Sequence, residues 1–126
     1  MAKGIIRKLD ELGRITIPIE IRRATGIDVL VPIDLTIENG VLYLRKGSGR
    51  RIDELGRYTI PKEIRSRYNW ETGSELEIFT HTDTVCFRKR GCDWCNNTEE
   101  LIDVKGRKLC RSCGEAVKVA LEGWSL

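Results

Sequence analysis

The sequence predicts an α+β protein built from small units, and three observations lead to this class. Short alternating strands around one short helix occur twice within residues 1–89, and two pairs of cysteines follow in residues 90–126. No apolar run approaches the roughly 18 to 20 residues of a membrane span. With 40% hydrophobic and 33% charged residues in a chain of 126, the composition favours one or two compact domains and leaves little room for a deep catalytic cleft.

An internal repeat appears when the sequence is aligned with itself at a spacing of 43 residues. Residues 7–46 then match residues 50–89 without a gap, with 14 of the 40 positions identical. We therefore expect four parts: a first repeat at 1–46, a linker at 47–49, a second repeat at 50–89 and a separate module at 90–126.

The first half of each repeat is expected to be a hairpin followed by a helix. Ile5 to Leu9 and Arg14 to Ile17 are short alternating segments, and Gly13 between them suits a turn with positive φ. Pro18 suits the first position of a helix, and Gly26 suits a left-handed cap at its end.

The second half of each repeat is expected to be another hairpin. In the first repeat, Asp34 to Glu38 and Val41 to Lys46 flank Asn39-Gly40, the strongest short hairpin sequence. Thr82-Asp83 is the weaker equivalent turn of the second repeat. One repeat is therefore ββαββ, and the apolar Val29 to Pro32 after the first helix suits either a buried strand or a contact surface.

Each repeat is too short to bury a sufficient core alone and needs a partner. The Gly-Ser-Gly linker at 47–49 spans at most about 10 Å. Such a short tether gives a high effective concentration, so we expect the two repeats to pair within the chain.

The stretch RKLDELGRITIPIEIRRATGI resembles the N-terminal DNA-binding domain of the AbrB and SpoVT transition-state regulators. The resemblance covers residues 3–46 and, comparably, 50–89. It implies that the two repeats interlock as a swapped-hairpin β-barrel, which the short linker keeps within one chain. It also implies a nucleoid-associated transcriptional regulator that binds double-stranded DNA, AT-rich DNA included. The lack of a membrane-length apolar run and of the apolar core of a secretory signal indicates a cytoplasmic location. Tandem copies resemble MraZ proteins, and a related barrel serves MazE antitoxins. The repeats differ at two places after the shared motif: Ser66 stands where the first repeat has Arg23, and Asn69-Trp70 stands where it has Gly26-Ile27. These differences predict an asymmetric DNA site.

The resemblance also implies which basic residues contact DNA. Guanidinium forks suit phosphate, and with a net charge of only +3 their placement matters more than their number. Arg14 and Arg57 are the leading candidates, and the alternative is that the basic residues are solvated partners of Asp10, Glu11, Asp53 and Glu54. The complete candidate set is Arg7, Lys8, Arg14, Arg22, Arg23, Arg50, Arg51, Arg57 and Arg65.

Four cysteines in the last part of the chain predict a metal site. The pairs Cys92-x2-Cys95 and Cys110-x2-Cys113 lie 14 residues apart, a spacing typical of structural Zn²⁺ held by four thiolates. The layout resembles a treble-clef zinc finger, with a hairpin about 105–107 and a helix from about 114 to 122. Two disulfides, iron or redox chemistry are the alternatives.

The expected C-terminal helix carries an apolar stripe made of Ala116, Val117, Ala120, Leu121 and Trp124. This stripe predicts a homodimer through residues 90–126, and simple packing on the zinc hairpin is the alternative. No combination of nucleophile, base and orienting acid recurs, so we expect no enzyme. Because no apolar run is long enough to span a membrane, we also expect no membrane partner. The alternative functions are an antitoxin-like protein-interaction module and a redox protein that uses the CxxC pairs.

Overall fold

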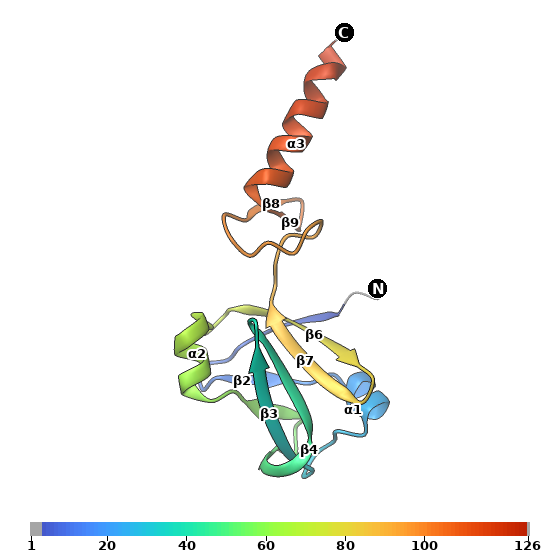
Figure 1. Ribbon diagram of the computed structural model, residues 1–126, viewed down its shortest axis with the longest axis vertical. Helices are drawn as coiled ribbons and strands as arrows, with labels where there is room; N and C mark the ends of the chain where they lie inside the picture. Colours follow the sequence, from blue (N-terminus) through green and yellow to red (C-terminus); the bar gives the residue numbers. More distant parts are fainter. Residues whose placement is uncertain (1–3, 126) are drawn as a thin grey trace. The chain divides into compact units, whose positions relative to one another are not determined.

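The computed structural model describes residues 4–125, and the chain divides into two compact units between Lys89 and Arg90 (Figure 1). The expected α+β class is confirmed as a mixed fold with antiparallel strands. Within the described residues, no helix is long and apolar enough to cross a membrane.

The first unit holds two short helices and the strands of two sheets. A five-stranded sheet has the order β1-β6-β7-β4-β3, and a two-stranded ribbon pairs β2 with β5. In chain order the elements are β1 (Ile5–Lys8), β2 (Arg14–Thr16), α1 (Ile19–Thr25), β3 (Pro32–Glu38), β4 (Val41–Arg51), β5 (Arg57–Thr59), α2 (Lys62–Tyr68), β6 (Glu75–His81) and β7 (Thr84–Lys89).

The predicted hairpin between residues 5–9 and 14–17 is wrong. A turn does form, since the Gly13 N–H donates to the Asp10 carbonyl at 3.1 Å. The strands on either side of it, however, pair with the second repeat: β1 runs antiparallel to β6, and β2 antiparallel to β5. The reason is burial, because a hairpin within one repeat would leave a core too small to exclude water.

The two repeats are joined by reciprocal main-chain hydrogen bonds as well as by strands. The Ile17 N–H donates to the Gly56 carbonyl, and the equivalent Ile60 N–H donates to the Gly13 carbonyl, both at 2.9 Å. Strands β4 and β7, one from each repeat, pair in the five-stranded sheet. The repeats therefore complete each other within a single chain.

The predicted linker at 47–49 is part of strand β4, which runs on to Arg51. The Ser48 N–H donates to the Asp34 carboxylate at 3.0 Å, and the β3–β4 register shifts between Pro32 and Ile33. The connection is therefore an extended, hydrogen-bonded strand, because glycine lets β3 approach closely: a Cβ at Gly47 would meet the Asp34 carboxyl group.

Both repeats contribute to one hydrophobic core. Ile15 and Tyr58 face each other across the β2–β5 ribbon, each 1% exposed, and the Tyr58 ring stacks on Phe87 with 6.5 Å between centroids. The buried-strand alternative for Val29 to Pro32 fails for its first three residues: Leu30 has a φ of 65° and is exposed, and of these three only Val29 packs on the core, while Pro32 begins β3.

Local turn and cap expectations are largely confirmed. Gly13 and Gly26 have φ of 75° and 72°, and Asn39-Gly40 has two positive φ values, 52° and 76°. Pro18 is the N-cap of α1, one residue before the first helical position that we expected, and Pro61 is the equivalent N-cap of α2.

The second unit contains a hairpin and one helix. Strands β8 (Ile102–Val104) and β9 (Arg107–Leu109) pair around Lys105-Gly106, and α3 (Arg111–Glu122) is followed by a 3₁₀ turn at Gly123–Ser125. The helix begins at Arg111, earlier than the expected residue 114, because Cys110 is already its N-cap and accepts from the Gly114 N–H.

Candidate nucleic-acid interface and metal centre

Two aspartates hold the two leading arginines in the same way. Asp10 Oδ1 accepts from the Leu12 and Arg14 N–H groups, and Asp10 Oδ2 accepts from Arg14 Nε at 2.7 Å. Asp53 repeats this arrangement with Arg57, whose Nε lies 2.8 Å from its carboxylate. Partial burial raises the pKa of both carboxyls, but the hydrogen bonds from the arginines outweigh it, so each pKa lies below its usual value.

Arg14 and Arg57 lie on the outer face of the β2–β5 ribbon. In the register, Arg14 is opposite Thr59 and Thr16 is opposite Arg57, while the central Ile15 faces the core. Because side chains alternate along a strand, the two arginines and two threonines share the face away from the core. The threonines were not among our candidates, although the repeated Arg-x-Thr pattern was visible in the sequence.

Arg22 and Arg65 are bound to the protein itself. Arg22 Nε donates to the Ile17 carbonyl at 3.1 Å, and its Nη1 donates to Asp28 at 2.7 Å. Arg65 Nε donates to the Ile60 carbonyl at 2.9 Å. A Cβ added to the turn glycine of the opposite repeat would meet each guanidinium. These two arginines therefore connect each helix to the turn of the other repeat.

Replacing Gly13 by alanine should destabilise the first unit more than replacing Gly73. Both glycines have a positive φ, 75° and 85°, which costs a non-glycine residue about 1–2 kcal/mol. A Cβ at Gly13 would also meet the Arg65 guanidinium, whereas nothing lies within 4 Å of one at Gly73. Urea denaturation of the two variants would measure the difference, and equal losses would mean that the arginine contact adds nothing to stability.

The remaining five candidates are exposed and form no ion pair with any residue in 4–125. They lie at the end of β1, on α1 and at the end of β4, and are Arg7, Lys8, Arg23, Arg50 and Arg51. The alternative pairing with acidic residues therefore occurs for Arg14 and Arg57, but not for these five.

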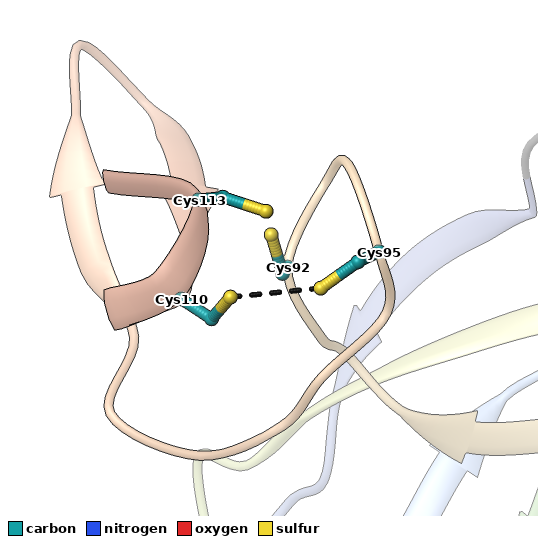
Figure 2. A group of neighbouring side chains, drawn as sticks. All are labelled: Cys92, Cys95, Cys110 and Cys113. Atoms are coloured by element: carbon teal, nitrogen blue, oxygen red, sulfur yellow. Dashed lines mark hydrogen bonds between the residues drawn. The ribbon is translucent and has the colours of Figure 1, made fainter. Parts of the chain in front are cut away.

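The four cysteines of the second unit come together from two elements: Cys92 and Cys95 lie in a loop, while Cys110 is the N-cap of α3 and Cys113 lies in its first turn (Figure 2). All four Sγ atoms lie within 4.8 Å of one another, and those of Cys95 and Cys110 are 3.5 Å apart. A tetrahedral ion with metal–sulfur bonds of about 2.3 Å would hold sulfurs about 3.8 Å apart. The cluster therefore has the dimensions and the donor set of a four-coordinate metal site.

Backbone hydrogen bonds favour the thiolate form of Cys92, which is the form that binds a metal. Burial raises the pKa of Cys92, but N–H groups of Cys110, Trp94 and Cys95 outweigh that effect and lower it to about 6. Burial and the neighbouring cysteine sulfurs raise the pKa of Cys113 to about 12. Four thiolates this close are stable only beside a cation, which is the chemistry that a divalent metal supplies.

Main-chain pairing joins the first cysteine loop to the hairpin. The Asp93 N–H donates to the Lys108 carbonyl at 2.7 Å, and the Lys108 N–H donates to the Asp93 carboxylate at 2.8 Å.

The fifth cysteine, Cys86, is buried in β7 of the first unit, as expected for a small hydrophobic residue. The four-cysteine cluster therefore uses only residues of the second unit.

Comparison with known proteins connects the repeats to two groups. The family described as antidote-toxin recognition MazE, bacterial antitoxin, matches residues 50–85. Over 43 residues the chain is 44% identical to the transition state regulatory protein AbrB of Bacillus subtilis strain 168 and, equally, to the Abh protein of that organism. Each of these two alignments covers 34% of this chain, and the chain spans about half of each relative, 45% and 47% of their lengths. No solved structure matches significantly.

Proposed function

We propose that this protein is a DNA-binding transcriptional regulator in which the two paired repeats form one binding surface. The observation that carries the proposal is the cross-pairing of β2 with β5, since it places the duplicated arginines Arg14 and Arg57 on one face. The identity to AbrB, named a transition state regulatory protein, supports the same function. The β1–β6 and β2–β5 pairs favour a swapped-hairpin barrel as the description of the first unit.

The exposed cations supply the sequence-independent part of binding. Lysine and arginine side chains that neutralise phosphates release counterions, so affinity falls steeply as salt rises. Arg7 and Arg50 occupy equivalent positions of the two repeats, are exposed and lack carboxylate partners among the described residues. They are therefore the clearest phosphate contacts, while Ser66 in place of Arg23 gives the two halves of the surface unequal charge.

Duplex DNA titrated with the metal-loaded protein at several salt concentrations tests the proposal. We expect the double variant Arg7→Gln with Arg50→Gln to weaken binding to all sequences and to reduce the salt slope by about 2, roughly one per phosphate contact. The variant Lys105→Gln with Arg107→Gln removes the same charge from the exposed end of the β8–β9 hairpin and should keep the slope. Wild-type protein that does not bind duplex DNA even at low salt would contradict the proposal.

An antitoxin-like protein-interaction module is the second candidate, and the MazE family match at residues 50–85 favours it. In that case the paired repeats bind a protein partner in place of, or as well as, DNA. This candidate would be supported over the first by two results together. The protein would not bind duplex DNA in the titration above, and the immobilised protein would capture a defined protein partner through residues 4–89.

We further propose that the four cysteines hold a structural Zn²⁺ in a treble-clef-like module. Zinc prefers four tetrahedral thiolates, and this closed donor set leaves no position for a substrate. The module then serves to position α3 rather than to catalyse a reaction. A regulator of this kind acts in the cytoplasm on the nucleoid.

We propose that α3 forms a homodimer through the second unit. None of its residues is buried, and Val117 alone of its apolar stripe packs on the cysteine cluster. Leu121 and Trp124 remain 44% and 82% exposed, and an isolated helix of this length is marginal in water. Sedimentation of the metal-loaded chain should give a dimer mass, and the variant Leu121→Glu with Trp124→Glu should give a monomer.

A further inference from the structure

We propose that the α3 helices of two copies pair antiparallel, so that Trp124 of each copy fills a groove beside Gly114 of the other. This inference rests on the proposed homodimer and adds to it the site of contact and the orientation of the two copies. The groove belongs to the second unit and lies between the start of α3 and the residues that lead into β8.

The groove is apolar where α3 approaches β8. Its volume is about 440 Å³, which is enough for an aromatic side chain, and its apolar lining comes from Leu101, Ile102 and Gly114. Because Gly114 has no side chain, the helix surface is open at this point, and a Cβ there would lie 3.3 Å from Ile102 Cδ1. Ile102 is still 50% exposed, so the described residues leave part of this apolar surface uncovered.

Charged side chains around the groove balance one another. Two are acidic and two are basic: Glu100, Glu115, Arg111 and Lys118. Arg111 lies 4.0 Å from Glu100 Oε1 and 3.1 Å from Glu115 Oε1, so its charge is already offset in part. A rim without net charge favours a neutral occupant and lets a second copy of the same rim approach without repulsion.

Trp124 is the occupant that the chain itself offers. It is 82% exposed at the end of α3 that points away from the β8–β9 hairpin (Figure 1). A buried indole N–H needs an acceptor, and the carboxylates around the groove can supply one. Trp124 lies ten residues beyond Gly114, about 15 Å further along the helix, so it cannot enter the groove of its own chain. The occupant therefore comes from a second copy.

An antiparallel pair brings each tryptophan to the groove of the other copy. When two α3 helices cross at the level of Val119, Trp124 of one is level with Gly114 of the other, since both lie five residues from that point. Leu121 is then level with Val117, so a larger residue meets a smaller one in both cases. A parallel pair would bring the two tryptophans together and leave both grooves open.

The area buried by this arrangement suits a specific dimer. A covered tryptophan buries about 150–250 Å², so two tryptophans and the groove surfaces against them bury about 600–1,000 Å² in total. Specific interfaces bury upwards of about 1,000 Å². Leu121, which is 44% exposed, adds to this area from each copy.

Sedimentation of the metal-loaded full chain over a range of concentrations tests the contact. We expect Trp124→Ala, which removes the occupant, and Gly114→Leu, which fills the groove, each to raise the dimer dissociation constant about tenfold or more. Gly114→Ala favours the helix but narrows the groove, so it should weaken the dimer while the fold is kept. Trp94→Ala removes another exposed tryptophan of the same unit and should leave the dimer unchanged.

A mixture of two variants tests the orientation. The Gly114→Leu chain keeps its tryptophan, and the Trp124→Ala chain keeps its open groove, so an antiparallel dimer of one chain of each kind has one intact contact. We expect the mixture to form dimers at a concentration at which neither variant does so alone. Circular dichroism and one bound metal per chain would confirm that both variants are folded.

The outcomes separate this inference from the homodimer itself. If the wild-type chain dimerises but the variants at both positions keep its dissociation constant, or if the mixture restores nothing, Trp124 does not occupy the groove and the inference is overturned while the dimer remains. If the wild-type chain sediments as a monomer at every concentration, both the inference and the proposed homodimer are overturned.

Discussion

Removal of the metal should unfold the second unit, from residue 90 onward, and leave residues 4–89 folded. The core of the second unit consists of Cys92, Leu109 and Cys110, with only a few partly buried neighbours. That is too little apolar burial for independent stability. Binding of structural zinc supplies about 10–16 kcal/mol at neutral pH, which is more than the stability of most small domains.

Chelator titration followed by circular dichroism and tryptophan fluorescence would measure this effect. Trp94 lies in the second unit and is 64% exposed, whereas Trp70 is buried in the first unit, so emission from the two units can be separated by Trp→Phe variants. We expect Cys110→Ser to reproduce the effect of the chelator and Cys86→Ala to retain one bound metal per chain. An intact hairpin and α3 in chelator, with the cysteines reduced, would contradict a structural metal and favour the redox alternative.

Separating the two repeats should abolish folding of the first repeat as a monomer. In a fragment of residues 1–49, β1 and β2 lose their partners β6 and β5, and only the β3–β4 hairpin keeps its ladder. An isolated two-stranded hairpin is marginal in water. The fragment therefore loses nearly all of the roughly 5–15 kcal/mol typical of a folded domain.

Circular dichroism at several concentrations would test the separation. We expect a dilute 1–49 fragment to be unfolded, and folding to return on addition of a 50–126 fragment or at high concentration through self-pairing. The 1–89 chain is the control, since its tether gives the second repeat an effective concentration on the order of millimolar. A folded monomer of 1–49 at low concentration would show that the repeats do not depend on each other.

Much of the local structure could be predicted from the sequence because it depends on residues close together in the chain. Asn39-Gly40 forms its turn, Gly13 and Gly26 adopt positive φ, and the cysteine spacing brings four sulfurs together. Each of these outcomes follows from backbone sterics or ligand chemistry within a short stretch.

The roles of the candidate arginines could be predicted only in part. Sequence reasoning placed Arg22 and Arg65 with the exposed cations, but each donates to a main-chain carbonyl and covers a glycine of the other repeat. It also missed Thr16 and Thr59, because their neighbours are set by strand register. A turn is marked by a short sequence such as Asn-Gly, but no short sequence marks the register between strands of different repeats.

The sequence by itself determined the repeat, the turns, the Gly26 cap that ends α1, and the cysteine pairs. The tertiary structure alone decided that β1 pairs with β6 and β2 with β5, and so which side chains share the ribbon face. The physical reason is that several strand edges offer the same alternating pattern, and the choice among them is made by burial of the whole core, to which residues far apart in the chain contribute together.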